Sequence, residues 1–215
     1  MSINHLIIFI KNPVKGKIKT RLARTIGPEN ALAVYIELLS HTAAVSKPVM
    51  AHRKCYYSDF IVNNDMFFDE YFEKQLQKGE EQGERMYNAF KDSFGEWSEK
   101  VILIGSDCYE LNSGIIEEAF KALNDHDFVI GPAFDGGYYL IGMKSLNKAV
   151  FENKPWSSEN VFLDTLLDIT KGGYSHYILP TLNDIDVEED LTEDLRSLIN
   201  DYGNFEDADN EDDDF

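Results

Sequence analysis

The chain has 215 residues, of which 43% are hydrophobic, so it can form one folded domain with a sizeable core and is not disordered throughout. Its formal net charge is -19 at pH 7, and residues 206–215 contain seven acids and no base. An acidic surface of this kind argues against nucleic acid as a partner, but it is compatible with an anionic nucleotide bound at a local basic or metal-bearing site.

The cysteine content and the N-terminal sequence indicate the cellular compartment of the protein. Two cysteines, Cys55 and Cys108, are too few for a disulfide scaffold or a cysteine-based zinc site. Met1 leads into the apolar run 6–10 without the features of a signal peptide, and no window approaches the length of a membrane span. We therefore expect a cytoplasmic protein.

The first apolar run, Leu6–Ile10, predicts a strand that is buried on both faces. A basic loop follows, with Pro13 and Gly16 as breakers, and Thr20 begins a helical turn. Backbone N–H groups and basic side chains converge in such a loop, which makes it a candidate phosphate site, although it lacks the glycines of a Walker loop or a G-x-G-x-x-G motif. The alternative is a solvated loop. Its bases are Lys11, Lys15, Lys17, Lys19 and Arg21.

Segments 28–47, 49–57 and 63–73 predict a helix, a strand, and a short helix or loop, respectively. In the helix, Pro28 suits the first position and Pro48 the end. The predicted core-facing stripe of this helix is Leu32, Tyr35, Ile36 and Leu39.

A glycine-containing turn at 79–83 opens a further predicted helix that begins at Glu84. A turn that opens a helix is a weak signal for binding an anion or the edge of a base. Gly83 and Arg85 are the candidate residues in this turn.

Four consecutive apolar residues at 101–104 predict a second doubly buried strand, which Gly105 ends. Ligands in open α/β sheets bind beyond the carboxyl ends of the strands, and Asp107 stands at that place. The alternative is that Asp107 caps the next helix, which is predicted to follow Asn112.

Predicted strands at 127–131 and 138–141 flank Asp135 and the paired glycines Gly136 and Gly137. Paired glycines permit unusual backbone conformations and the close approach of a ligand, so we expect a substrate loop here. Trp156 precedes a helix with apolar residues between 161 and 169, and it is either a core residue or the wall of a pocket.

After a last predicted strand at 173–179, Asp184, Asp186 and Asp190 suggest a metal cluster, although acids here also fit the first turn of a helix. Asp184-Ile-Asp-Val also resembles the nucleophile motif of haloacid-dehalogenase-like phosphatases. We reject that interpretation, because the phosphatase motif should end the first strand of its domain. A final helix carries Leu191, Leu195 and Leu198. We expect a single domain over 1–203 and a disordered acidic tail over 204–215.

Five sequence blocks occur in a fixed order along the chain. They are Phe9-Ile-Lys-Asn-Pro with Gly16-Lys-Ile-Lys-Thr-Arg-Leu-Ala, Gly83-Glu-Arg-Met, Gly105-Ser-Asp-Cys, Gly131-Pro-Ala-Phe-Asp-Gly-Gly-Tyr-Tyr-Leu-Ile-Gly, and Asp184-Ile-Asp-Val-Glu-Glu-Asp-Leu. Taken together, the blocks resemble the bacterial DUF2064 family over residues 6 to 200. Two departures are Tyr109, where the family usually has proline, and Glu80-Glu-Gln, where it often has Gly-Asp-Leu.

This resemblance implies a three-layer α/β/α fold of the glycosyltransferase-A type, with a mixed and mostly parallel sheet. The family is also described as glycosyltransferase-A-like and is associated with radical-SAM, selenium or arsenosugar gene neighbourhoods. The implied activity is transfer from a nucleoside-diphosphate sugar with Mg²⁺ or Mn²⁺. Two alternatives are nucleotidyl transfer from a nucleoside triphosphate to a phosphorylated acceptor, with pyrophosphate as product, and a non-catalytic nucleotide-binding protein.

Within this interpretation each candidate residue has an expected role. Asp107 is expected to ligate the metal and take part in catalysis, with Asp186 as a second ligand, and Asp135 to bind the acceptor or act as general base. The candidates on the nucleotide and phosphate side are Lys11, Lys19, Arg21, Gly83 and Arg85, and those on the substrate side are Gly136, Gly137, Tyr138 and Trp156.

Overall fold

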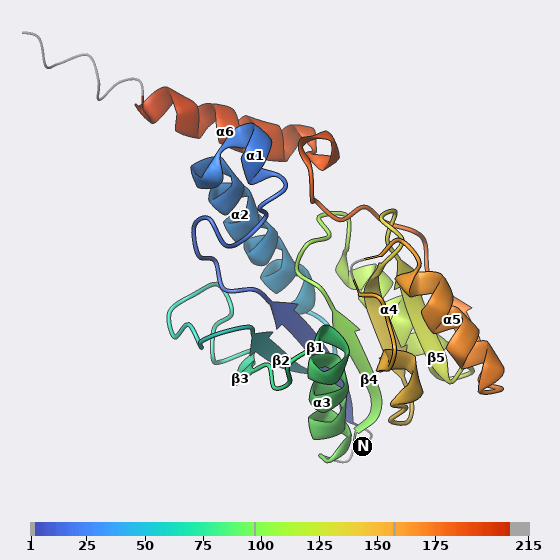
Figure 1. Cartoon of the computed structure of the whole chain (residues 1–215). Coiled ribbons are helices and arrows are strands. Elements are labelled where there is room, and N and C mark those ends of the chain that lie inside the picture. The colour runs from blue at the N-terminus through green and yellow to red at the C-terminus, as the bar shows by residue number, and fades with distance from the viewer. Residues whose placement is uncertain (1–2, 97, 157, 207–215) are drawn as a thin grey trace, which may run out of the picture.

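A computed structural model describes residues 3–96, 98–156 and 158–206 of the chain. Its strands are β1 (Ile3–Ile10), β2 (His52–Tyr57), β3 (Glu73–Leu76), β4 (Ser98–Ile104), β5 (Phe128–Pro132), β6 (Tyr138–Met143) and β7 (His176–Ile178). They form one sheet in the order β3-β2-β1-β4-β6-β5-β7 (Figure 1). Strand β6 runs antiparallel to β4 and β5, whereas the other neighbouring pairs are parallel, so the sheet is mixed and mostly parallel, as predicted.

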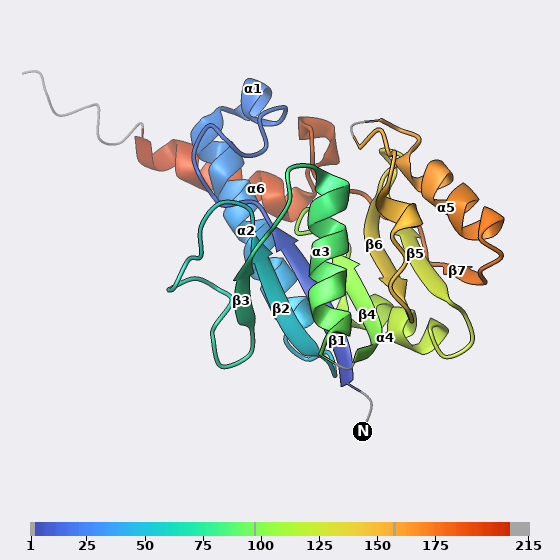
Figure 2. The same ribbon diagram turned by 60° about the horizontal axis from the view of Figure 1, so that its bottom comes forward.

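Helices cover both faces of this sheet. Figure 2 shows α3 in front of β1 and β4, with α2 behind the same strands. The side chains form two cores, one between the sheet and α2, α4 and α6, and the other between the sheet and α3, α5 and η1. The helices are α1 (Ala23–Ile26), α2 (Pro28–Ser46), α3 (Gln82–Phe94), α4 (Ser113–Ala122), α5 (Val161–Lys171) and α6 (Glu193–Glu206), with 3₁₀ turns η1 (Ala149–Phe151) and η2 (Glu188–Asp190).

The two central strands, β1 and β4, are the runs that the sequence predicts to be buried on both faces. They pair in parallel with Ile8 opposite Ile104, and their apolar residues are almost fully buried. Alternate residues of each strand enter the two cores, which explains why the runs show no polar alternation.

The sequence does not predict strand β3, because residues 63–73 favour a short helix or loop and a glycine-containing turn follows at 79–83. The strand is only four residues long, and its sequence, Glu-Lys-Gln-Leu, carries two charges. It lies at the edge of the sheet and pairs with β2 alone, so it does not need a continuous apolar run. The remaining predicted strands and helices are present with shifted ends.

Helix α2 confirms the predicted boundaries but not the whole predicted stripe. Ile36 is 42% exposed, whereas the small residue Ala31 is buried. The buried face runs through positions 31, 34, 35, 38, 39 and 42, which have helical spacing but include small and polar residues. The predicted stripe was chosen from large apolar residues alone, and it is therefore rotated about the helix axis relative to the buried face of α2.

The last helix reaches into the segment 204–215 that is predicted to be an acidic tail. Helix α6 extends to Glu206 and includes Asn204, and the division into a domain over 1–203 and a tail stays a prediction. Once a helix is nucleated, each added residue gains a hydrogen bond, which favours this extension. The rest of the predicted tail, 207–215, lies outside the described residues. Within the described part of the chain, no helix has the length and apolar character needed to span a membrane.

The topology brings three loops to one end of the sheet. The basic loop after β1 and the loop after β4 are adjacent, because these strands are parallel neighbours. Strand β5 runs in the same direction as β4, so its turn into β6 lies at that end too. The segment after β7 joins them, since Leu182 forms a bridge with Ala133.

Candidate functional site

The side chain of Lys19, from the loop after β1, lies between the carboxylate of Asp107, which follows β4, and that of Asp186, which follows β7. Its Nζ is 3.0 Å from Oδ1 of Asp107 and 3.1 Å from Oδ1 of Asp186. The Lys19 side chain is 5% exposed, and the two carboxylate side chains are 32% and 36% exposed. The structure thus brings together three predicted site residues that lie far apart in the sequence.

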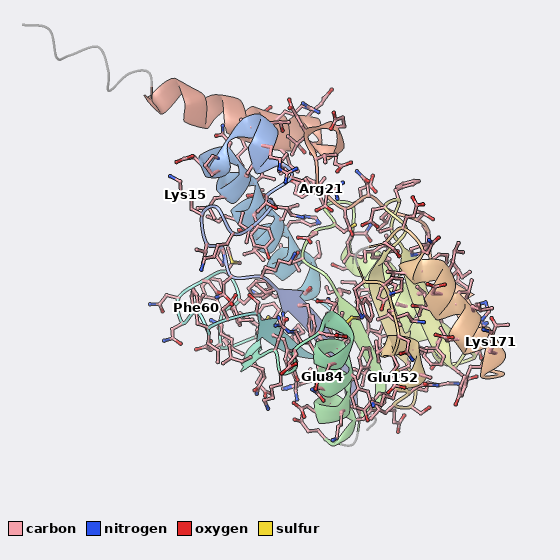
Figure 3. The ribbon with its side chains drawn as sticks, in the orientation of Figure 1. Lys15, Arg21, Phe60, Glu84, Glu152 and Lys171 are labelled. Carbon is pink, nitrogen blue, oxygen red and sulfur yellow. The ribbon has the colours of Figure 1, made fainter. Side chains whose placement is uncertain are left out.

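Arg21 extends this cluster towards solvent. Its Nη1 is 3.5 Å from Oδ2 of Asp186, and its side chain is 65% exposed. Figure 3 shows Arg21 and Lys15, both from the basic loop, in the part of the molecule that contains α1. Arg21 therefore leaves hydrogen-bond donors available at the mouth of the cluster.

The electrostatic environment keeps Lys19 charged. Burial by itself would lower the pKa of the ammonium, but the charges of Asp107 and Asp186 outweigh burial and raise the pKa above its ordinary value. Lys19 therefore remains a cation at physiological pH.

Tyr35 of α2 supports the start of the basic loop. Its hydroxyl accepts a hydrogen bond from the backbone N–H of Lys11, lies 3.0 Å from the carbonyl oxygen of Lys11, and is 3.1 Å from Oγ of Ser106. Burial, followed by the charge of Asp107, raises the pKa of Tyr35, so the hydroxyl remains protonated. The side chain of Lys11 itself is exposed at this end of the sheet.

Asn12, which the sequence analysis did not single out, ties the basic loop to the loop after β2. Its side-chain oxygen accepts hydrogen bonds from the backbone N–H of Asp59, at 2.9 Å, and of Phe60, at 3.3 Å. Its side-chain nitrogen donates to the carbonyl oxygen of Phe60 at 2.7 Å. The side chain is buried, so these bonds satisfy an amide that would otherwise be costly to bury.

Asp190 has a structural role in the C-terminal acidic segment. Its Oδ2 accepts hydrogen bonds from the backbone N–H groups of Asp186 and Val187, each at 2.9 Å. Its Oδ1 accepts from the side-chain amide of Asn183 at 3.1 Å. Asp190 thus orients the segment that carries Asp186, in agreement with the helix-turn alternative for this acid.

Asp184 belongs to the acidic segment 184–190 but is not among the residues that the sequence predicts for the site. Burial, followed by the charges of Asp107 and Asp135, raises its pKa to about 7, whereas Lys19 acts in the opposite direction. Its Oδ1 is buried, and no hydrogen-bond partner for it exists among the described residues. The charges of Asp107, Asp135 and Lys19 thus all act on Asp184. The fold brings these residues together from distant parts of the chain, so the spacing of the acids alone could not reveal the arrangement.

The loop that carries Asp135 is a tight turn wedged against the start of α5. Oδ1 of Asp135 accepts a hydrogen bond from the backbone N–H of Gly137 at 2.8 Å. Gly136 has φ of 89°, and a Cβ there would lie 1.9 Å from the carbonyl oxygen of Glu159. The carbonyl oxygen of Gly136 also accepts from the backbone N–H of Phe162. Glycine at 136 is therefore required by backbone conformation and by packing.

Four other predicted site residues make their contacts around α3. A Cβ on Gly83 would lie 2.3 Å from the carbonyl oxygen of Phe151, and Gly83 also packs against the ring of Trp156. The rings of Trp156 and Tyr138 meet edge to face at 6.5 Å. Arg85 donates from Nε to the carbonyl oxygen of Gly79 at 2.9 Å. Close packing explains the glycine at 83, which lies inside the first turn of α3 rather than before it, and ligand roles for these four residues remain predictions.

The donor atoms at Asp107 and Asp186 are of the kind that Mg²⁺ or Mn²⁺ binds, since both ions prefer carboxylate oxygens. The two Oδ1 atoms lie near one common point, at which the structure has the ammonium of Lys19. No group of three histidine, cysteine or acidic side chains within 3–96, 98–156 and 158–206 is arranged to hold a metal ion. The two carboxylates therefore have the chemistry that a divalent ion requires, and the cation that they hold in this structure is the ammonium of Lys19.

A family model described as "Uncharacterized protein conserved in bacteria (DUF2064)" matches residues 38–158. This range contains Asp107 and Asp135 but not Lys19 or Asp186. No curated protein matches the sequence.

Solved structures share the fold. A "putative nucleotide-diphospho-sugar transferase" from Desulfovibrio desulfuricans G20 is 27% identical, with a TM-score of 0.81 over 94% of this chain and 99% of that one. A cytidylyltransferase from Leptospira borgpetersenii serovar Hardjo-bovis (strain JB197) is 11% identical, with a TM-score of 0.55 over 100% of both chains. A 4-diphosphocytidyl-2C-methyl-D-erythritolsynthase from Anaerococcus prevotii DSM 20548 is 11% identical, with a TM-score of 0.57 over 94% of this chain and 96% of that one. The predicted α/β fold of nucleotide-diphospho-sugar transferases is thus confirmed, and the last two likenesses concern the fold alone.

Proposed function

The chain belongs to the DUF2064 family, and from this premise we propose that it is a transferase that glycosylates a small acceptor from a nucleoside-diphosphate sugar with Mg²⁺ or Mn²⁺. The 27% identical structure from Desulfovibrio desulfuricans, whose description names a nucleotide-diphospho-sugar transferase, supports the donor class. The predicted connection to radical-SAM or arsenosugar chemistry stays a prediction.

The observation that carries the proposal is the meeting of Lys19 and Arg21 with Asp107 and Asp186 at one end of the sheet. Breaking the bond between a sugar and a diphosphate leaves negative charge on the diphosphate. Fixed cations placed where this charge develops stabilise the transition state. A basic loop beside paired carboxylates supplies both the cations and the ligands for a divalent ion.

We assign the donor phosphates to the cationic side chains of Lys11, Lys19 and Arg21. Asp107 and Asp186 would hold the divalent ion, which when bound supplies further positive charge to the leaving diphosphate. Gly83 and Arg85 remain our candidates for the nucleoside side of the donor, since they lie in the first turn of α3.

We assign the acceptor to the loop of Asp135. The carboxylate is held by the N–H of Gly137 through one oxygen, Oδ1, which leaves Oδ2 to accept a proton from an acceptor hydroxyl. Gly136 would shape this part of the site through its packing against Glu159, and Gly137 has no side chain that could cover the carboxylate of Asp135. The aromatic pair Tyr138 and Trp156 would border the acceptor.

The test is to identify the product. The protein is incubated with a panel of nucleoside-diphosphate sugars or nucleoside triphosphates, in Mn²⁺, with a small-molecule extract as the source of acceptors. Release of a nucleoside diphosphate from one sugar donor, lost in an Asp135→Asn variant, supports the proposal. Pyrophosphate release from a triphosphate contradicts it and assigns nucleotidyl transfer. Nucleotide binding without either product contradicts it and leaves a non-catalytic binding protein.

A further inference from the structure

The ammonium of Lys19 is enclosed, whereas the carboxylates that hold it are open to solvent. Its Nζ lies within 3.1 Å of one oxygen of each carboxylate, and its side chain is far less exposed than either acid. An ion arriving from solvent thus meets the outer oxygens of Asp107 and Asp186 first. It cannot bind between the two carboxylates while the ammonium remains there.

The backbone directs Lys19 into this position. Lys19 has φ of 44°, in the left-handed region that residues other than glycine seldom adopt. The neighbouring side chains Ile18 and Leu22 are buried, and the carbonyl oxygen of Lys19 accepts a hydrogen bond from the N–H of Ala23 at 2.8 Å. The packing of both neighbours thus holds the backbone of Lys19 in this sparsely populated conformation.

The other bases of the loop are placed differently. Arg21 reaches only Asp186, at 3.5 Å and from the exposed side. Lys17 is exposed, and Lys15 pairs with Glu29. Among the described residues, Lys19 alone contacts both carboxylates.

We propose that Lys19 is a built-in competitor of the divalent ion, and that the donor diphosphate relieves the competition by drawing the ammonium onto its own oxygens. This rests on the proposed function for the identity of the diphosphate. Lys19 and the ion favour the same pair of carboxylates, so each weakens binding of the other. A diphosphate that binds Lys19 frees the carboxylates, so nucleotide and metal bind cooperatively, and the coupling is reciprocal. The site thereby discriminates against a metal ion that arrives without the nucleotide.

The first measurement is a Mn²⁺ titration without nucleotide, with free Mn²⁺ followed by electron paramagnetic resonance. The variants Lys19→Met and Lys19→Gln remove the charge, and Lys17→Met is the matched control from the same loop. Melting by circular dichroism verifies that each variant is folded, and two neutral replacements guard against the failure of one. We expect both Lys19 variants to bind Mn²⁺ on the order of tenfold more tightly than the wild type, and Lys17→Met to match the wild type. Equal or weaker Mn²⁺ binding by the Lys19 variants overturns the proposal.

The second measurement repeats the titration of the wild type with saturating UDP, GDP, ADP, CDP or dTDP. We expect one of them to tighten Mn²⁺ binding on the order of tenfold, and to do so less in the Lys19 variants. If the nucleotide tightens Mn²⁺ binding by the same factor in the Lys19 variants as in the wild type, the proposed role of Lys19 is overturned. If none of these nucleotides binds, the proposed donor class fails, whereas the titration without nucleotide still decides whether Lys19 competes with the ion.

Discussion

The backbone N–H of Ile185 donates a hydrogen bond to the backbone carbonyl oxygen of Asp107, at 2.9 Å. This bond fastens the segment after β7 to the loop after β4, although the two lie far apart in the sequence. Asp184 and Asp186, on either side of Ile185, are thereby brought to Asp107. The candidate site consequently depends on a contact between segments that are distant in the chain.

Asp107→Asn should weaken the binding of nucleotide with Mn²⁺ by at least about tenfold, because it removes a charged ligand and leaves a poorer one. The fold should persist, since the side chain is partly exposed and Lys19 keeps Asp186 as a partner. Calorimetric titration and a thermal melt measure the two effects. The control is Glu189→Gln, an exposed acid of the C-terminal segment. Unchanged affinity in Asp107→Asn would remove this residue from the metal site.

Asp135→Asn should leave nucleotide affinity almost unchanged and lower the rate of transfer, since a positioned general base contributes roughly 10²–10⁴-fold. Asparagine retains an oxygen that can accept the hydrogen bond from Gly137, so the turn should survive. Donor affinity, melting temperature and transfer rate are measured on the same variant. Weaker donor binding at normal stability would move Asp135 to the metal side of the site.

Gly136→Ala should destabilise the protein more than Gly16→Ala. Both glycines have positive φ, at 89° and 76°, so alanine strains each backbone by about 1–2 kcal/mol. Only at 136 would the new Cβ collide with a carbonyl oxygen, that of Glu159, whereas at 16 the space is open. Overpacking should add about 1–3 kcal/mol to the loss at 136. Urea denaturation of both variants measures the difference, and equal losses would show that the turn is not wedged against α5.

His5 should contribute a loss of stability between pH 7 and pH 5.5, whereas Asp184, whose pKa is raised to about 7, contributes in the opposite direction. Burial, and then the charge of Lys54, lowers the pKa of the buried His5 imidazole from 6.5 to about 4. The unfolded chain therefore takes up this proton more readily than the folded one, so stability is lost as the pH falls from 6.5 towards 4. The free energy of unfolding of the wild type, relative to that of His5→Gln, should therefore fall by about 1 kcal/mol from pH 7 to pH 5.5. The free energy of unfolding of both proteins is measured by urea denaturation at each pH. An identical pH dependence in the two proteins would contradict the lowered pKa of His5.

Much of the fold can be predicted from the sequence, because the two central strands consist of unbroken apolar runs. The runs in β1 and β4 are buried on both faces and are flanked by clear turn signals, and the topology then places Asp107 at a carboxyl end. Strand β3 could not be predicted from the sequence. It is an edge strand that pairs with one neighbour, and its residues show no apolar pattern. The antiparallel direction of β6 likewise follows from its partners and not from its own residues.

The site was predictable as a set of residue types but not as a set of contacts. Asp107, Asp186 and Lys19 were all predicted, yet the sequence could not indicate that the ammonium lies between the two acids. Gly83 looked like part of a binding turn, whereas its lack of a side chain is explained by packing against Phe151 and Trp156. In each case the deciding partner comes from a distant segment of the chain.

The central claim is that the basic loop and the neighbouring carboxylates bind the diphosphate of a nucleotide. Its most direct test is a calorimetric titration of UDP, GDP, ADP, CDP and dTDP, each with Mn²⁺, into the wild type and Arg21→Gln. Arg21 is largely exposed, so its replacement should leave the fold unchanged. We predict that at least one nucleotide binds the wild type, and that Arg21→Gln binds it several-fold more weakly because one phosphate contact is lost. Absence of binding by every nucleotide, or identical affinity in Arg21→Gln, would contradict the claim.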